Sequence, residues 1–412
     1  MRDPAAPSGP LRGFSPLRHR DFRLLWSGSL VSNVGTWMQR IAQGWLVLTL
    51  TGSPFWLGID AFLGEAPFLA FSLFGGVLAD RAERRKILLV SQLVQMSCAL
   101  TLAALVATDR ITLGAILTAS AVTGLAQAFG GPAFQALVPM LVPSDELPKA
   151  VVLNSIQFNF ARVVGPAVGG VAFASMGAAG CMGLNGLSFL AVVVALSAIP
   201  AKPGTGGGGA TVLEGLREGI GAVWGRPSLR GLVGLAFLGT FCANPLLTFL
   251  PLFARDVFHQ GAQRYSALLS AFGCGAVAGG IVVVTASSRL PRRGLLSAAG
   301  LCAYGFLIAA FALSTLPALS FALLVSAGAC QMVVFSGFMT LVQTSVGDAL
   351  RGRVVSIYSL AFRGGMPLGN LAAGTAAVAV GAPAVLVALG AVLAAAGGIS
   401  VGRRRKGGVA EI

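Results

Sequence analysis

Two acidic side chains, Asp60 and Glu65, lie inside a long apolar stretch, whereas the other acids among the 14 fall in polar segments or near the ends of such stretches. A charged side chain at the centre of a bilayer costs about 2.5–3.5 kcal/mol on insertion scales, so residues that bear this cost are candidates for a function. A carboxyl group in such a place can take up or release a proton as its access to water changes. Asp60 and Glu65 are therefore the candidates for proton coupling.

Arg40 is the candidate cation beside these acids. It belongs to a polar stripe, Ser29, Asn33, Thr36, Arg40 and Gln43, whose members recur three or four positions apart and so share one helix face. A permanent ion pair with Arg40, or a hydrogen-bonded carboxylate at a cavity mouth, is the alternative to coupling. Five residues separate the two acids by about 140° around a helix, so they both face one cavity squarely only if Pro67 distorts it.

Three further segments carry polar stripes, and a polar stripe on a membrane helix is expected to face a water-filled cavity. They are Thr240, Asn244 and Thr248; Ser336, Thr340 and Gln343; and Ser356, Ser359, Arg363, Pro367 and Asn370. We expect the stripes to converge on a substrate cavity. Its candidate lining residues are Asn33, Thr36, Arg40, Gln43, Asn244, Thr340, Gln343, Ser359 and Arg363.

The elements that position these residues are predicted to be membrane-spanning helices. The 412 residues are 55% hydrophobic and only 10% charged, whereas a soluble chain carries about 25% charged residues. Apolar runs recur at about the twenty-residue length that crosses a hydrocarbon core, where the backbone must be helical. The predicted fold is all-α, with twelve spans at roughly 23–50, 56–79, 87–107, 111–138, 150–174, 178–199, 229–253, 265–288, 294–314, 317–343, 353–378 and 383–402.

The net charge of +15 is distributed unevenly along the chain. With the N-terminus placed in the cytoplasm, 23 of the 29 Lys and Arg residues fall on the inner side, three fall in outer loops, and Arg40, Arg162 and Arg363 fall inside spans. This bias is the positive-inside rule for an even number of spans with both termini inside. The basic excess is thus expected to set topology and to meet anionic lipids, and it does not indicate nucleic-acid binding.

The chain is predicted to consist of two related halves. A cytoplasmic tail at 1–22 precedes a six-helix bundle at 23–200, and a linker at 201–228 contains an amphipathic helix from Val212 to Trp224. A second bundle follows at 229–402, with a cytoplasmic tail at 403–412. Arg162 and Pro166 recur as Arg363 and Pro367 at the same separation of 201 positions, which indicates a duplication. Such repeats are typical of secondary transporters with a binding site between the halves.

Residues 76–86 read GVLADRAERRK and include Gly76, Asp80, Arg81, Arg84 and Arg85. This segment resembles the signature cytoplasmic loop of the major facilitator superfamily, although Glu83 stands where that family usually has Gly. The corresponding loop of the second half, at 289–293, lacks the Asp. The resemblance implies that Asp80 and Arg81 take part in a charge network between helices that favours the outward-open state.

The segment from Arg162 through Gly165, Pro166, Gly169 and Gly170 resembles the antiporter motif of drug:proton exporters in that superfamily, with Ala161 in place of the usual upstream Gly. Tight helix packing by small residues is an equally good account of the glycines. For Arg162 and Arg363, anchoring to neighbouring helices is favoured over substrate binding. Taken over nearly the whole chain, the sequence resembles the branch that contains macrolide-efflux and enterobactin-export proteins, which implies export.

We therefore expect a proton-coupled exporter of small amphipathic compounds that works by alternating access. It is expected to be a monomer in a bacterial-type plasma membrane, with no cofactor, metal, ATP or nucleic acid and no enzymatic activity. The six cysteines are scattered through spans, and the glycine run at 204–209 is not followed by the Lys and Ser or Thr of a phosphate-binding loop. An importer or a lipid flippase of the same fold remains an alternative, as does a membrane receptor without transport activity.

Overall fold

Helices make up nearly all of the chain that the computed structural model describes, namely residues 10–200, 212–286 and 293–406. The bounds are α1 Arg20–Thr51, α2 Pro54–Arg81, α3 Arg84–Ala107, α4 Leu113–Leu137, α5 Leu147–Ala198, α6 Val212–Trp224, α7 Pro227–Leu252, α8 Ala262–Ala286, α9 Arg293–Leu313, α10 Pro317–Thr344, α11 Asp348–Val380 and α12 Ala382–Lys406. Short turns of other helix types lie at Pro10–Arg18 (η1), Val138–Met140 (η2) and Phe253–Val257 (η3).

Proline and glycine divide the apolar sequence into these helices. Pro54, Pro227 and Pro317 occupy first helical positions, where the missing N–H is not needed. Gly52 ends α1 in the left-handed conformation with φ of 63°. Gly177, with φ of 66° and ψ of −167°, interrupts α5 and divides it into two spans.

The prediction of twelve spanning helices is confirmed. Nine helices of the described chain are long and apolar enough to cross a membrane, and one of these is the double-length α5. The two remaining spans are α1 and α11, which carry the polar stripes that contain Arg40 and Arg363. The amphipathic α6, which links the halves, has the bounds that the sequence predicted.

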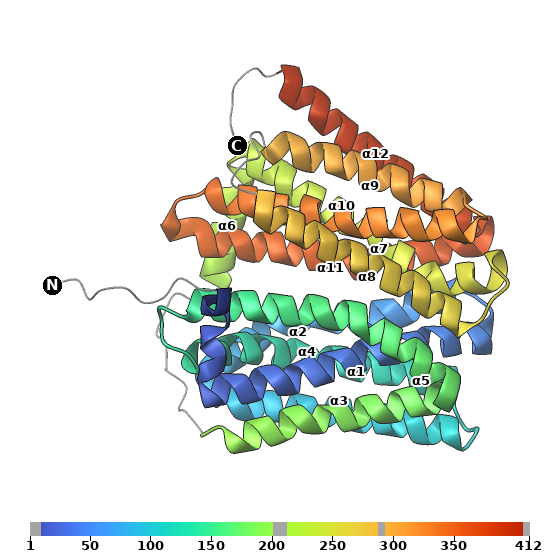
Figure 1. Ribbon diagram of the computed structural model, residues 1–412. Helices are drawn as coiled ribbons and strands as arrows, with labels where there is room; N and C mark the ends of the chain where they lie inside the picture. The colour runs from blue at the N-terminus through green and yellow to red at the C-terminus, as the bar shows by residue number, and fades with distance from the viewer. Residues whose placement is uncertain (1–9, 201–211, 287–292, 407–412) are drawn as a thin grey trace.

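The spans form two six-helix bundles, stacked one above the other in Figure 1. In the first bundle α1 and α3 pack against α5, and α2 and α3 against α4; in the second α7 packs against α11, and α9 against α12. Contact between the bundles is concentrated in two pairs, α2 with α11 and α5 with α8. The start of α1 and the end of α12 lie at one end of the molecule, here called the terminal face, and the turn between α1 and α2 lies at the opposite, distal face.

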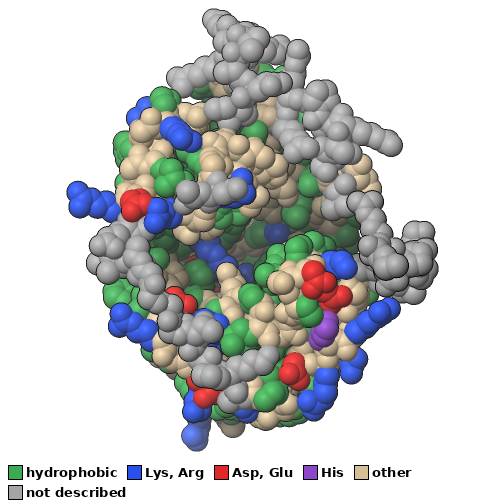
Figure 2. Space-filling model, turned by 90° about the vertical axis from the view of Figure 1, so that its left-hand side faces the viewer, with side chains coloured by type: hydrophobic (Ala, Val, Ile, Leu, Met, Phe, Trp, Pro, Cys, Tyr) green, Lys and Arg blue, Asp and Glu red, His purple; other side chains and the backbone are tan. Residues whose placement is uncertain are grey.

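The two bundles meet closely toward the distal face. A Cβ added to Gly58 of α2 would lie 2.5 Å from the Asn370 carbonyl oxygen of α11, and Gly374 of α11 lies directly beside it. On the terminal face the surface is instead hollowed between the bundles, with basic side chains visible deep inside (Figure 2). The described molecule is therefore closed at the distal face and open at the terminal face.

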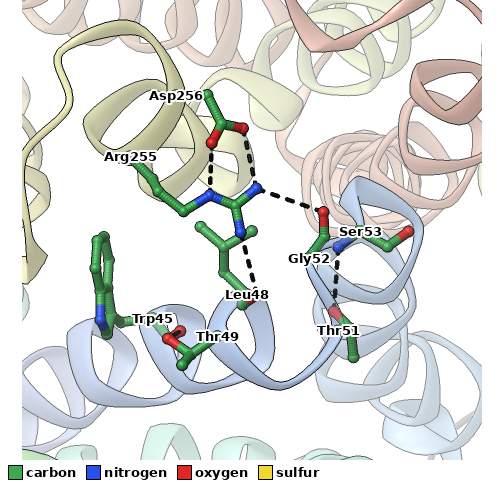
Figure 3. Close-up of polar contacts among 8 residues, drawn as sticks. All are labelled: Trp45, Leu48, Thr49, Thr51, Gly52, Ser53, Arg255 and Asp256. Carbon is green, nitrogen blue, oxygen red and sulfur yellow. Dashed lines mark hydrogen bonds and ion pairs between the residues drawn. The ribbon is translucent and has the colours of Figure 1, made fainter.

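A second contact between the bundles lies at the distal face. Arg255, in η3 at the end of α7, donates to the carbonyl oxygens of Leu48 and Gly52 at the end of α1, at 3.4 Å in each case (Figure 3). Asp256 holds the same guanidinium through contacts of 2.5 and 3.0 Å. We call this group the Arg255 bridge. A cation at the C-terminal end of α1 also interacts favourably with the helix dipole.

Part of the predicted domain organisation falls outside the described residues, namely residues 1–9 of the N-terminal tail, 201–211 of the linker, 287–292 of the loop between α8 and α9, and 407–412 of the C-terminal tail. The described part of the linker docks on the second bundle. Glu218 of α6 pairs with Arg353 of α11, and Arg226 donates to the Ser345 carbonyl oxygen at 3.0 Å.

Candidate functional site

Asp60 is half-buried and lies where α2 passes α1 and α4. The Gln43 amide of α1 donates to its two carboxylate oxygens at 2.9 and 3.0 Å, and the Ser120 hydroxyl of α4 donates at 2.5 Å. Gln43, which was predicted as a cavity residue, is half-buried and is a hydrogen-bond partner of Asp60. Tyr265 of α8 approaches from the other bundle, with its hydroxyl 3.2 Å from where a Cβ on Gly44 would lie. The hydrogen-bond partners of the carboxyl group are thus neutral, and Arg40 acts on it electrostatically without forming an ion pair.

Glu65 is the acid that pairs with Arg40, at 3.5 Å. Asp60 forms no ion pair with any side chain that the structure describes. The two acids therefore contact neighbouring turns of the same α1 stripe, Asp60 through Gln43 and Glu65 through Arg40. The two acids lie about 140° apart around α2, which continues as a helix through Pro67. Both are nevertheless contacted from α1, because the side chains of Gln43 and Arg40 are long enough to reach them.

Arg162 spans the junction between the bundles. Its guanidinium donates to the Gln331 side chain of α10 at 2.9 Å, and Gln331 in turn contacts the Tyr304 hydroxyl at 3.3 Å. The guanidinium also lies 5.8 Å from the Trp37 ring centre and 5.2 Å from that of Phe272. Its Nε is buried and has no hydrogen-bond partner. A buried guanidinium N–H is rarely left without a hydrogen-bond partner, so this atom is unusual.

Arg363 also reaches across the junction. Its guanidinium lies 4.0 Å from the centre of the Phe68 ring on α2. It forms no ion pair with another described side chain, although Glu65 is near enough to act on it electrostatically. Both repeat-related arginines thus contact the opposite bundle, Arg162 through a hydrogen bond and Arg363 through an aromatic ring.

The remaining cavity candidates divide into three kinds. Asn244, together with Thr248, donates to Asn370 of α11 at 3.2 and 3.0 Å, which joins two helices of one bundle. Thr36 and Thr340 donate to carbonyl oxygens of their own helices. Asn33 and Ser359 are half-buried, and Gln343 is exposed near the end of α10.

The loop between α2 and α3 contacts only the first bundle among the described residues. Arg84 donates to the Ala79 carbonyl oxygen at 3.0 Å and to that of Ala136 at 3.4 Å, and it lies 3.8 Å from Asp80. Arg85 donates to the Ser197 carbonyl oxygen at 3.4 Å. Asp80 and Arg81 are exposed, and Gly76 faces open space. The predicted charge network with Asp80 and Arg81 is thus not engaged across the bundles in this open-terminal state.

The glycines of the antiporter-like segment lie where α5 meets two other helices. A Cβ on Gly165 would collide with the Trp37 Cβ of α1 and lie 2.9 Å from the Val34 carbonyl oxygen, while one on Gly169 would lie 3.1 Å from the Met38 Cα. Gly170 faces Ser266 of α8, whose hydroxyl donates to the Pro166 carbonyl oxygen at 2.5 Å. Close packing therefore requires these glycines, and it includes the contact between the bundles.

A family model described as transmembrane secretion effector matches residues 11–406 of the chain. The multidrug efflux pump Tap of Mycolicibacterium fortuitum is 26% identical over 378 residues, which covers 86% of this chain and 89% of that protein. The staphyloferrin A transporter of Staphylococcus aureus is 28% identical over 155 residues, 37% of this chain and 38% of that protein, so the chain matches well under two thirds of that relative.

Solved structures of transporters share the fold. A bacterial homologue of the human lysosomal transporter Spinster, in an inward-facing and unoccupied conformation, superposes with a TM-score of 0.73 at 16% sequence identity. The match covers 97% of this chain and 98% of that one. At this identity the likeness concerns the arrangement of the helices alone.

Proposed function

Because the chain belongs to the transmembrane secretion effector family of the major facilitator superfamily and is a multi-pass membrane transporter of small molecules, we propose that it is a proton-coupled exporter of drug-like or siderophore-like amphipathic compounds. The observation that carries this proposal is Asp60, a half-buried acid inside a span whose partners in the structure are neutral. The relatives named for efflux and for siderophore transport support the substrate class.

Alternating access is the proposed mechanism. The bundles touch at the distal face through Gly58 and the Arg255 bridge and are separated by the hollow at the terminal face. The biased distribution of Lys and Arg favours a cytoplasmic terminal face in a bacterial-type plasma membrane. On this assignment the site is open to the cytoplasm, substrate enters there, and the bundles then rock to release it on the other side.

Asp60 would couple this movement to protons. In the described state its carboxylate accepts hydrogen bonds from Gln43 and Ser120 on two other helices. When the distal side opens, water from outside reaches the carboxyl group and protonates it. When the terminal side opens, the proton is released to the cytoplasm. The protein functions as a monomer on this proposal, and its basic ends contact anionic lipid head groups.

Purified protein in proteoliposomes tests the proposal directly. A panel of amphipathic compounds is offered with and without an imposed pH gradient, and extrusion that depends on the gradient is expected for at least one of them. Uptake of the best substrate in place of extrusion would identify an importer, and movement of labelled lipid alone would identify a flippase. Movement of none of these would count against transport and favour the receptor alternative.

The Arg255 bridge is expected to stabilise the closed distal face. Arg255→Ala removes both hydrogen bonds to the end of α1, so the population with an open distal face should rise at least about tenfold, since hydrogen bonds to charged groups contribute about 1.5–3 kcal/mol. Spin labels at Arg110 and Thr315, exposed positions of the two bundles at this face, report the change as a longer distance.

Arg264→Ala is the matched control for this measurement. Arg264 lies at the same face, but its described partners, Gln260 and the Phe321 ring, belong to its own bundle. The distribution of distances between the two spin labels in Arg264→Ala should equal that of the wild type. If the distance distribution of Arg255→Ala also equals that of the wild type, the Arg255 bridge does not stabilise the closed distal face.

A further inference from the structure

Three guanidinium groups gather around aromatic rings at the junction of the bundles. The Arg40 and Arg162 guanidinium groups lie 4.5 and 5.8 Å from the same Trp37 ring centre, and Arg363 lies 4.0 Å from the Phe68 ring centre. We call these three residues the arginine cluster. Two like charges that share one ring repel each other, although the Arg40 side chain is 53% exposed, so water screens part of this repulsion.

The acidic side chains near the arginine cluster do not balance its positive charge. Glu65 pairs with Arg40 at 3.5 Å and is also the acid that acts on Arg363. Asp60 is held by Gln43 and Ser120. Even with both acids ionised, three cations face two anions, which leaves an excess of one positive charge. A protonated Asp60 increases the excess.

The N–H groups of the cluster are not fully used. Arg162 gives one N–H to Gln331 and leaves a buried Nε without a partner. Arg363 stacks on Phe68 and has no described acidic partner. A guanidinium that rests on a ring still presents its edge, whose parallel N–H groups match the two oxygens of a carboxylate.

We infer that the substrate is an amphipathic organic monoanion whose carboxylate binds the arginine cluster while its apolar or aromatic body packs against the partly exposed Phe68 ring. A single negative charge matches the excess of one, whereas a phosphate monoester carries about −1.5 to −2 at neutral pH. Relief of the repulsion between Arg40 and Arg162 adds to the attraction. This inference rests on the proposed function, since it names the substrate class of the same transport site.

Export of a monoanion is compatible with proton coupling. An anion that leaves the cell and a proton that enters both move in the direction that an inside-negative membrane potential favours. The potential and the pH gradient thus act together on such a cycle. A cationic substrate would have to leave against the potential and would meet the three arginines on its way.

Binding measured without any gradient separates this inference from the transport proposal. Three probes share one ring system and differ in charge: 2-naphthylacetate, 2-naphthaleneethanol and 2-naphthaleneethylamine. They are titrated calorimetrically into the full chain in lipid nanodiscs, with empty nanodiscs as the blank. The acetate should bind at least about tenfold more tightly than the alcohol, because a hydrogen bond between charged groups exceeds the 1.4 kcal/mol that a factor of ten requires.

Substitutions then locate the anion site. Arg363→Gln and Arg162→Gln should each weaken acetate binding by about tenfold or more and leave alcohol binding within about twofold. Glu65→Gln should strengthen acetate binding, because it frees Arg40 and raises the positive excess. Arg264→Gln, which removes an arginine that stacks on Phe321 outside the junction, should change neither. Size-exclusion profiles and unfolding temperatures identify any variant that fails to fold.

Several results would overturn the inference and leave the transport proposal intact. These are equal binding of the three probes, preference for the amine, no binding of any probe by folded wild-type protein, or acetate binding that survives both arginine substitutions. Gradient-driven extrusion of neutral or cationic compounds alone would have the same consequence. Transport by the wild-type protein that does not depend on the pH gradient, together with selective binding of the acetate, would instead overturn proton coupling and retain the anion site.

Discussion

Asp60→Asn should abolish accumulation driven by a pH gradient while leaving downhill exchange of substrate across the membrane measurable. An amide can still take part in hydrogen bonds with Gln43 and Ser120, so the local packing of α1, α2 and α4 is retained. The amide cannot bind a proton, so movement of substrate is no longer coupled to the pH gradient. The rate of gradient-driven transport in proteoliposomes should fall at least tenfold, and counterflow of labelled substrate should persist.

Two further variants complete this experiment. Asp109→Asn is the matched control, because Asp109 lies in the turn between α3 and α4 with φ of 54°, a conformation that Asn adopts readily. It should transport like the wild type. Glu65→Gln breaks the pair with Arg40 and should keep its dependence on the gradient. Loss of that dependence in Glu65→Gln alone would transfer the coupling role to Glu65, and full retention in both acid variants would refute carboxylate coupling on α2.

Gly165→Ala should lower both the unfolding temperature and the transport rate. The added methyl group meets the Cβ of Trp37 and the backbone of Val34, and neither can yield without moving α1. Overpacking of this kind costs about 1–3 kcal/mol. Because Arg40 and Arg162 both rest on the Trp37 ring, a shift of α1 also displaces the arginine cluster.

Gly234→Ala on α7 is the control with the opposite expected sign. Nothing lies within 4 Å of the position that its Cβ would take. Replacement of a helical glycine by alanine without a clash stabilises a helix by about 1 kcal/mol. Thermal unfolding of the two variants in the same detergent therefore distinguishes packing from helix propensity, and equal unfolding temperatures would contradict the role given to Gly165.

Hydropathy made the fold predictable. A membrane accepts only helices or closed barrels, so runs of about twenty apolar residues predicted most of the spans, and the bias of Lys and Arg predicted their direction. The predicted break between the fifth and sixth spans is the turn at Gly177, and the amphipathic segment from Val212 to Trp224 is α6. The resemblance to the major facilitator superfamily is likewise confirmed by the family match and by the shared fold.

The partners of the site residues were harder to predict. Ser120, Tyr265 and Gln331 lie among other polar residues of their spans, such as Thr123 near Ser120 and Ser336 near Gln331, and the sequence alone does not show which of them face the candidate site. Their importance arises from which helices become neighbours and at what rotation, which depends on packing over the whole bundle. The pairing of Arg40 with Glu65 instead of Asp60 has the same origin.

The helices α1 and α11 are more polar than the other spans, and this difference has a consequence for their insertion into the membrane. Both carry an arginine in a polar stripe, and neither is apolar enough to be recognised as a span by itself. A translocon that samples one segment at a time would release such helices to the bilayer poorly. Stable insertion of α1 should wait for α5, whereas α11 can insert against α7, which is synthesised before it, since these pairs pack against each other. In each bundle, then, one helix that lines the junction would enter the membrane together with its packing partner, which follows α1 in the chain but precedes α11. Helix packing within the bilayer would therefore begin before synthesis of each half is complete.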